Sequence, residues 1–206
     1  MDPHPIPGSP YVHVCFLENK QYLRYICLLF VYQMDSTLHD SSVPWIALLI
    51  TNISKSANIK SLLLAAYAFG CRQIFVCNQP KFNFDYSHPN SDIPKQLQDG
   101  FLKIFRFHSF DECVQHIRLI GAQLVGVEIH DDAIDIEEDT CFMGDTVLIM
   151  GNEATGLNSK HCSACSKFIR ISQCGGGTAS LNVYVAASIV LHRFQIWSNG
   201  QNKLAT

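Results

Sequence analysis

Charged residues are scarce in this chain of 206 residues: they make up 16% of it, whereas hydrophobic residues make up 48%. A composition this apolar can bury a sizeable core, which excludes wholesale disorder. An excess of positive charge is also lacking, because 15 Lys and Arg stand against 18 Asp and Glu, for a net charge of −3. This balance argues against a protein that holds nucleic acid by bulk positive charge.

Apolar runs long enough to span a bilayer do not stand out. The run YICLLFVY at 25–32 has eight residues, whereas a span needs about 20, so we expect no membrane partner. Residues 1–44, with four prolines among the first ten, are expected to form a partly loose extension. We expect one domain over 45–200 and a short tail over 201–206. Cytoplasm is the default compartment, and an organelle is the alternative because the amino-terminal segment is unusual.

The nine cysteines lack the regular pattern of a disulfide framework. Their number is odd, their spacing is scattered, and the chain is longer than small disulfide-dependent scaffolds. We interpret them as reduced thiols that are mostly buried. Cys162 and Cys165 form a CxxC beside His161, but the second ligand pair of a structural zinc site is missing. The sequence therefore predicts no metal.

Apolar segments of strand length alternate with helical patterns from residue 45 onward. The segment WIALLIT at 45–51 is continuously apolar, as expected for a strand covered on both faces. A helix is predicted over 58–69, where Gly70 is a stop signal. Further strands are predicted at 73–77, 101–106, 123–129, 145–150 and 167–171, and further helices at 111–120, 158–165 and 180–197. This alternation predicts an α/β fold with a parallel sheet flanked by helices.

Three unusual loops follow predicted strands, at the edge where parallel sheets bind ligands. They span 52–58, 151–157 (GNEATGL) and 173–182 (QCGGGTASLN). The two loops that contain glycine spell neither GxxxxGK[ST] nor GxGxxG, so pyrophosphate binding is not indicated. Glycine still lets a ligand lie close to the backbone. An adenine-bearing ligand of another kind therefore stays open.

The last predicted helix, 180–197, is apolar on nearly every face. A helix of this kind must be buried on all sides. A partner subunit could cover the face turned away from the sheet, and the alternative is a central helix in the core of a monomer. We favour a dimer, and on this view a charge at Val190 would dissociate it.

The sequence resembles the SpoU group of RNA ribose 2′-O-methyltransferases, within the SPOUT class, in three motifs. These are NIKSLLLAAYAFG (58–70), GNEATGL (151–157) and ISQCGGGTASLNVYVAASIVLHRF (171–194). The resemblance covers roughly residues 45–197. It implies a carboxyl-terminal trefoil knot, S-adenosylmethionine as cofactor, structured RNA (tRNA or rRNA) as partner, and a homodimer that packs through the last helix.

The resemblance also assigns the site residue by residue. Adenosine would be held by backbone contacts and apolar walls at Gly151, Ile171 and Leu181. The polar active-site positions are Asn58, Glu153, Ser180 and Asn182. Glu153 has a structural alternative as a brace of its own loop, and Ser180 could simply be the N-cap of the last helix.

Leu64 stands where the family has the first-motif arginine that is credited with proton removal. It lies opposite the apolar stripe of its helix, as either a surface leucine or part of a second packed surface. One alternative is that another group, such as Lys60 on the same face, supplies the positive charge. The other is a catalytically inactive SpoU-fold protein, either an RNA-binding or assembly factor or an inactive subunit. The motifs favour the active methyltransferase.

Acidic residues gather away from the motifs. The stretch 128–139 holds seven acids and no Lys or Arg, whereas 151–193 holds one acid, Glu153, against four bases. Charge patterning is thus more informative than the total. We expect an RNA partner near the motifs, with the acidic stretch kept away from its phosphates.

Overall fold

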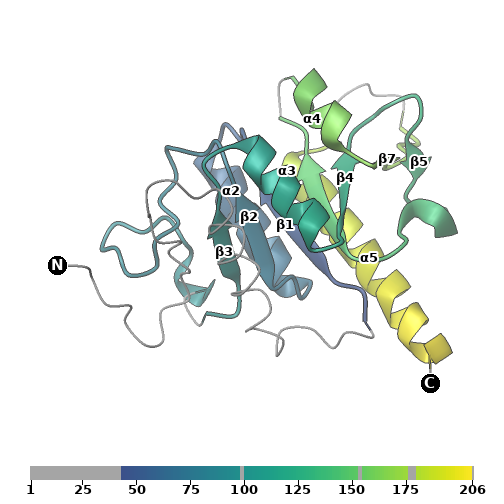
Figure 1. The fold of residues 1–206 in the computed structure, drawn as a ribbon, viewed down its shortest axis with the longest axis horizontal. Coiled ribbons are helices and arrows are strands. Elements are labelled where there is room, and N and C mark those ends of the chain that lie inside the picture. Colours follow the sequence, from purple (N-terminus) through teal and green to yellow (C-terminus); the bar gives the residue numbers. More distant parts are fainter. Residues whose placement is uncertain (1–42, 98–99, 153–154, 176–179, 206) are drawn as a thin grey trace.

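The computed structural model describes residues 43–97, 100–152, 155–175 and 180–205, which form a parallel sheet with helices on both faces (Figure 1). Its seven strands run in the order β3-β2-β1-β6-β4-β7-β5. The strands are β1 (Ile46–Ile50), β2 (Gln73–Val76), β3 (Lys103–Arg106), β4 (Gln123–Val127), β5 (Ile134–Asp135), β6 (Thr146–Met150) and β7 (Lys167–Arg170). The helices are α2 (Ser56–Ala68), α3 (Phe110–Leu119), α4 (Ser159–Ala164) and α5 (Val183–Ala205), with short 3-10 turns at Lys95–Leu97 and Asp139–Cys141.

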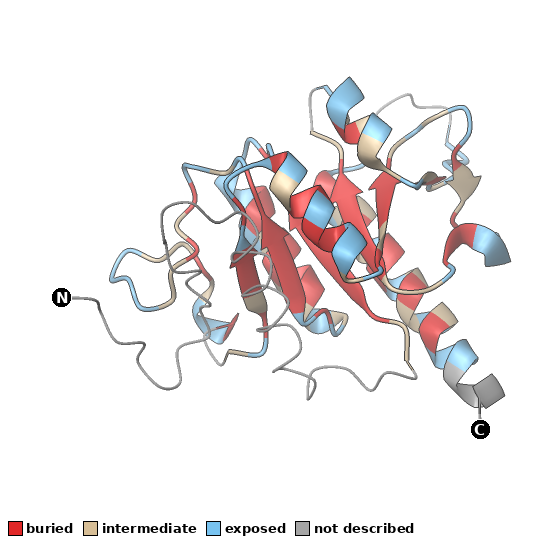
Figure 2. Cartoon of the chain, viewed as in Figure 1, coloured by how far each residue is buried: buried red, intermediate tan, exposed pale blue. Residues whose placement is uncertain are grey.

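Strand β1, in the interior of the sheet, is buried along its whole length, which explains its unbroken apolar sequence (Figure 2). Successive side chains of a strand point to opposite faces of the sheet. Leu48 belongs to the apolar cluster on one face, and Leu49 belongs to the cluster on the other. Because helices cover both faces, neither set could be polar.

Helices α2 and α5 cover one face of the sheet and pack against each other. Buried residues recur along α5 at the spacing of one helix side. They are Val183, Ala187, Val190, Leu191 and Phe194. The expectation for Val190 was therefore wrong: its side chain is fully buried within this chain and cannot face a partner. The opposite, outer side of α5 instead exposes Ile189 and Ile196, and Tyr184 is exposed on the flank between the two sides.

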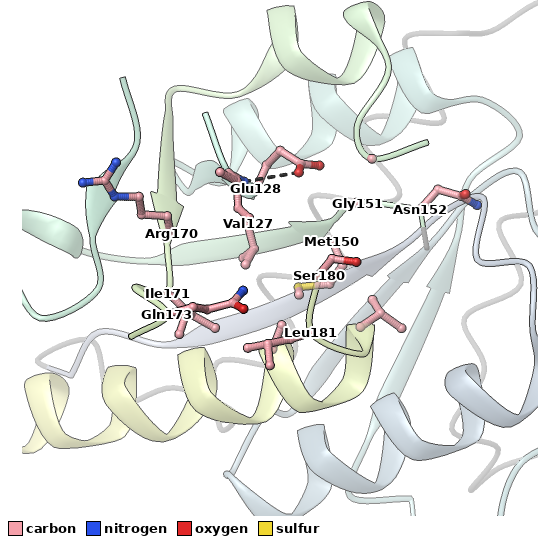
Figure 3. Close-up of a pocket in the computed structure, with 14 residues that line it drawn as sticks. Val127, Glu128, Met150, Gly151, Asn152, Arg170, Ile171, Gln173, Ser180 and Leu181 are labelled. Carbon is pink, nitrogen blue, oxygen red and sulfur yellow. Dashed lines mark hydrogen bonds between the residues drawn. The ribbon is translucent and has the colours of Figure 1, made fainter. Parts of the chain in front are cut away.

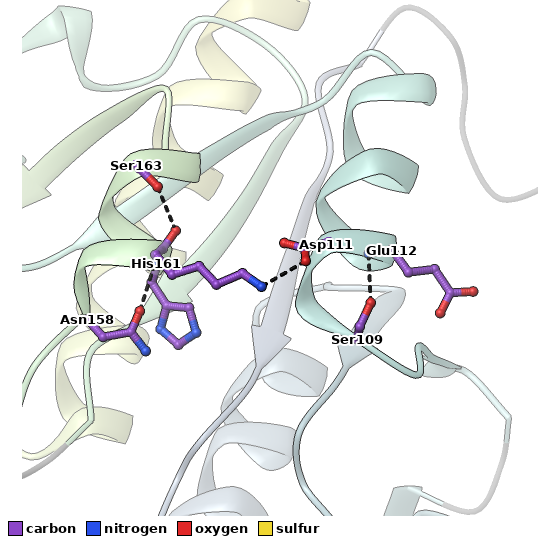
Figure 4. Close-up of polar contacts among 7 residues, drawn as sticks. Ser109, Asp111, Glu112, Asn158, His161 and Ser163 are labelled. Carbon is purple, nitrogen blue, oxygen red and sulfur yellow. Dashed lines mark hydrogen bonds and ion pairs between the residues drawn. The ribbon is translucent and has the colours of Figure 1, made fainter.

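Helices α3 and α4 cover the other face, and polar contacts fix their ends (Figure 4). The Ser109 hydroxyl accepts a hydrogen bond from the Glu112 N–H at 3.2 Å, and the Asn158 side chain accepts one from the His161 N–H at 2.8 Å. Both are N-caps that satisfy backbone donors with no partner inside the helix. Lys160 of α4 pairs with Asp111 of α3 at 2.8 Å, but both side chains are exposed, so the pair contributes little to stability.

The predicted fold class, a parallel sheet flanked by helices, is confirmed, and most of the predicted strands and helices are found with small shifts at their ends. The exception is the last helix, which runs on to Ala205 and so includes most of the stretch expected to form a tail. The sequence missed β5, whose two residues lie inside the acidic stretch and are too few to show a period. The last helix begins at Val183, so Ser180 is not its N-cap. Asn182 takes that place, because its side-chain oxygen accepts from the Tyr184 N–H at 3.1 Å.

Other expectations concern segments outside the described residues. The apolar run at 25–32 and most of the expected extension lie there, as do residues 176–179 of the third motif. The trefoil knot stays a prediction. Among the described residues, no helix is both long and apolar enough to cross a membrane.

Candidate functional site

Three loops meet where β1, β6 and β7 end, at the carboxyl edge of the sheet. They are Thr51–Lys55 and the described residues of the stretches 151–157 and 171–182. Parallel strands bring the ends of distant segments to one edge. The loops therefore lie together although the first and the last are more than a hundred residues apart in sequence.

Asn152 joins the second loop to the first. Its side-chain nitrogen donates to the Asn52 carbonyl at 2.7 Å and to the Ser54 hydroxyl at 3.0 Å. Its side-chain oxygen accepts from the Thr155 N–H at 3.3 Å, within its own loop. The second loop is closed by backbone hydrogen bonds between Asn152 and Gly156 in both directions, at 3.1 and 2.9 Å. One asparagine thus orients two of the three loops.

Asn58 and Asn182 join the first motif to the third. Asn58 lies in the first turn of α2 and is buried, with 5% of its surface exposed. The Asn182 side-chain nitrogen donates a hydrogen bond to the side-chain oxygen of Asn58 at 3.4 Å. Two residues that the sequence assigned to the polar active site are therefore adjacent in space.

A cavity of about 190 Å³ lies between the second and third loops and the end of β4. Figure 3 shows residues that line it. Its apolar walls are Val127, Met150, Ile171, Leu181, Val183 and Ala186. Gly151, Ile171, Ser180 and Leu181, all predicted from the sequence, line it together. Asn58 and Asn182 are not among the described residues that line it, and Glu153 lies outside the described residues.

Glu128 lines the same cavity, although the sequence placed it in an acidic stretch away from the site. It follows β4, and its carboxylate lies against the second loop. The Leu157 N–H donates to its Oε2 at 3.0 Å, and the Ile129 N–H donates to its Oε1 at 3.2 Å. A Cβ added at Gly151 or Gly156 would lie 2.5 or 2.6 Å from Oε2. Glycine at both positions is therefore what lets the carboxylate approach the loop.

Arg170, at the end of β7, is the other charged residue among the described residues that line the cavity. Its Nε lies 4.0 Å from the Asp135 carboxylate, which also accepts a hydrogen bond from the Ser172 hydroxyl. The hydrogen bond from Ser172 lowers the pKa of Asp135, with smaller contributions from the Glu137 N–H and Arg170. β5 thus supplies an anion that orients a cation at the cavity. Sequence patterns did not indicate this contact between Asp135 and Arg170, because they did not predict β5.

Leu64 is half-buried and packs against the apolar cluster that α2 and α5 share. The same cluster contains Leu62 and Leu63 of the predicted stripe. Leu64 is therefore a packed residue and not a scattered surface leucine, but it packs on the same core as the stripe. Lys60 is an exposed residue of α2 whose Nζ lies 3.7 Å from the Asp92 carboxylate in the long loop after β2. It is not among the described residues that line the cavity.

The seven cysteines in the described part of the chain are free thiols, four of them buried. Burial raises the pKa of Cys165 to about 12, so this member of the CxxC stays protonated. His161, its neighbour, is buried against the Phe110 ring at 4.5 Å between centroids. Within the described ranges, no three His, Cys, Asp or Glu side chains gather as metal ligands would.

Comparison with known proteins agrees with this geometry. Residues 46–192 match the SpoU rRNA Methylase family. The chain belongs to this family. It is also 26% identical over 97 residues to a tRNA (guanosine(18)-2′-O)-methyltransferase of Escherichia coli (strain K12). That match covers 47% of this chain and 42% of the relative, so the matched part is less than half of the curated relative's length.

Solved structures of the family share the fold. The AdoMet-bound rRNA methyltransferase from Sinorhizobium meliloti has a TM-score of 0.62 at 20% identity and covers 75% of this chain and 57% of its own. The A. aeolicus TrmH/SpoU tRNA modifying enzyme has a TM-score of 0.61 at 18% identity, covering 84% and 85%. The SpoU methyltransferase AviRb from Streptomyces viridochromogenes, in complex with AdoMet, has a TM-score of 0.58 at 25% identity, covering 75% and 58%.

Proposed function

We propose that this protein is a methyltransferase that uses S-adenosylmethionine to methylate the ribose 2′-hydroxyl of a structured RNA, tRNA or rRNA. The observation that carries the proposal is the meeting of the second and third SpoU motifs at one cavity at the carboxyl edge of the sheet, with the first motif joined to the third beside it. Gly151, Ile171, Ser180 and Leu181 line that cavity. The hydrogen bond between Asn58 and Asn182 joins the first motif to the third. Relatives with the same fold are named as RNA methyltransferases.

The residues of the cavity fit an adenosine-bearing, zwitterionic cofactor. Met150, Ile171 and Leu181 offer apolar walls for a purine, and Gly151 lets a ligand lie against the backbone. Glu128 and Arg170 provide one anion and one cation for the polar groups. These are the residues that would hold the cofactor, which supplies a methyl group already activated by its sulfonium.

Given that activation, the chain must align the ribose oxygen with the methyl group and help the hydroxyl to lose its proton. The Asn58–Asn182 pair is suited to alignment, because its amides offer both donors and acceptors. Ser180 lines the cavity two residues before Asn182 and can accept or donate a hydrogen bond there. Leu64 has no proton to exchange, so the positive charge that assists proton loss comes from elsewhere in the complex.

The test combines binding with turnover. We expect calorimetry to show S-adenosylmethionine binding, and we expect the natural sequence to transfer a labelled methyl group to total tRNA or rRNA. Leu64→Arg serves as the comparison, with thermal denaturation to check that it folds. Cofactor binding without transfer, together with transfer restored by Leu64→Arg, would favour the inactive alternative for the natural sequence.

We further propose that the protein works as a homodimer through the outer side of α5. The support is the exposure of large apolar side chains there: Ile189 and Ile196, seven residues apart and therefore on the same side of the helix, are 37% and 52% exposed. Exposed apolar side chains that share one side of a helix are typical of an interface. For the compartment we propose the cytoplasm, and an organelle is the alternative. Imaging of the tagged protein in cells would distinguish the two.

A further inference from the structure

We propose that Glu128 is the residue that recognises the ribose of the cofactor, by accepting hydrogen bonds from the hydroxyls of the adenosine. The inference rests on the proposed function, because it needs a nucleoside in the cavity. It assigns a binding role to a residue that lies outside the three SpoU motifs.

The position of Glu128 is fixed by the sheet. Its backbone N–H donates to the Ile169 carbonyl at 3.1 Å, which continues the pairing of β4 with β7 to the edge of the cavity. Its carboxylate then lies against Gly151, the residue that marks the adenosine position, and against Gly156. A nucleoside that lies on the backbone of Gly151 is therefore beside this carboxylate.

Among the residues of the cavity, Glu128 is the one whose chemistry suits it to accept hydrogen bonds from the ribose hydroxyls. A carboxylate accepts hydrogen bonds and offers about four lone-pair sites. Two N–H groups, of Leu157 and Ile129, occupy one site on each oxygen. Each oxygen thus keeps capacity for a further donor. Arg170 donates only, so Glu128 is the only charged acceptor among the described residues that line the cavity.

A vicinal diol is the donor pair that matches two carboxylate oxygens. The ribose presents two adjacent O–H groups, and hydrogen bonds to an ionised acceptor are stronger than those to neutral ones. The adenine amino group is the competing donor on the nucleoside. The apolar walls suit the flat base, which leaves the acceptor for the sugar. This use of an acid at a strand end parallels the acidic residue that binds a ribose 2′-hydroxyl in dinucleotide-binding folds.

The experiment measures coupling between the side chain and one hydroxyl. Dissociation constants are determined by calorimetry for S-adenosylhomocysteine, its 2′-deoxy analogue and its N6-methyl analogue, with the natural protein and with Glu128→Gln and Glu128→Ala. Glu137→Gln, an exposed acid of the same stretch, is the matched control. Thermal denaturation confirms that each variant is folded.

We expect the natural protein to lose about tenfold or more in affinity when the 2′-hydroxyl is absent. In Glu128→Ala this penalty should shrink to less than about threefold, and Glu128→Gln should fall between the two. Glu137→Gln should keep the full penalty. A role in bracing the loop alone would weaken all three ligands equally and leave the penalty unchanged, which would overturn the inference.

Two other outcomes are separable. A coupling that follows the N6-methyl group and ignores the 2′-hydroxyl would place the amine, and not the sugar, at Glu128, and would overturn the ribose assignment. Failure of the natural protein to bind S-adenosylhomocysteine or S-adenosylmethionine would overturn the proposed function itself.

Discussion

The side-chain nitrogen of Asn182 donates to the side-chain oxygen of Asn58 at 3.4 Å, which connects the N-cap of α5 to the first turn of α2. The same two helices pack along the apolar cluster below. Any shift of α5 against α2 therefore changes the relative position of two polar residues of the site.

Replacement of Asn58 by alanine should impair methyl transfer more than cofactor binding. Asn58 is not among the described residues that line the cavity, so the cofactor dissociation constant should change by less than about threefold. Transfer should fall by about tenfold to a hundredfold, because small misplacements of reacting groups cost this much. Calorimetry and single-turnover transfer separate the two effects. Asn199→Ala, on the exposed side of α5, should leave both unchanged.

Replacement of Gly156 by alanine should destabilise the second loop for two separable reasons. Gly156 has a φ of +67°, and its added Cβ would lie 2.6 Å from the Glu128 carboxylate. Gly121→Ala is the matched control, because Gly121 has a φ of +75° but nothing within 4 Å of the added Cβ. We expect Gly121→Ala to cost about 1 kcal/mol in the free energy of unfolding and Gly156→Ala to cost more.

Glu128→Ala removes the clash but also removes the hydrogen bonds that the carboxylate accepts from the Leu157 and Ile129 N–H groups. In the Glu128→Ala background, Gly156→Ala should therefore cost only the conformational part, about as much as Gly121→Ala. Chemical denaturation measures the three single variants and the double variant. Equal costs for Gly156→Ala and Gly121→Ala would contradict a steric role of the carboxylate.

Charges on the outer side of α5 should separate the proposed dimer. Ile189→Asp and Ile196→Asp place a carboxylate on exposed positions, so the chain should stay folded and elute as a monomer in size-exclusion chromatography with light scattering. Gln201→Glu adds a charge to the same helix at an exposed position that points about 140° away from Ile196, so this variant should remain dimeric. Val190→Asp should instead unfold the chain, because it buries an unpaired charge in the core. A dimer that survives both isoleucine changes would place the interface elsewhere.

The free energy of unfolding should decrease as the pH is lowered, because of His116. This residue of α3 is 1% exposed, among Phe75, Phe105 and Phe107, and neither of its ring nitrogens has a hydrogen-bond partner among the described residues. Burial lowers its pKa from 6.5 to about 4. Between those values the unfolded chain binds a proton that the folded protein does not, so stability decreases as pH falls through this window.

The loss should approach about 3 kcal/mol near pH 4. It is measured by urea denaturation between pH 4 and pH 7 in the natural protein and in His116→Leu. The difference in slope between the two proteins isolates the histidine from other titrating groups. Parallel pH profiles would show that His116 does not titrate as its burial demands.

The fold was largely predictable because the signals were long or repeated. The run at 45–51 and the alternation after it define β1 and its neighbours, and family motifs brought Gly151, Ile171, Ser180 and Leu181 to one cavity. Burial along α5 was harder to predict. An apolar sequence indicates that a helix is covered, but does not tell which residues face the same chain, so Val190 was misassigned.

Glu128 and Asn152 escaped prediction for another reason. Their roles depend on contacts between segments that are distant in sequence, Glu128 with Leu157 and Asn152 with Asn52. A local pattern reports charge and period, and it grouped Glu128 with the acids that follow it. The strand order of the sheet is what turns this one acid toward the cavity.

The strand order also has a consequence for how the protein is made. β1 lies between β2 and β6, and Ile46 pairs with Thr146, a hundred residues later. At a synthesis rate of about 5–20 residues per second, the edge of β1 that pairs with β6 stays unpaired for several seconds until β6 has been synthesised. Pairings this distant form slowly and expose the nascent chain to aggregation. The arrangement that gathers the three motifs at one edge of the sheet thus leaves an apolar strand edge exposed until residue 146 has been synthesised.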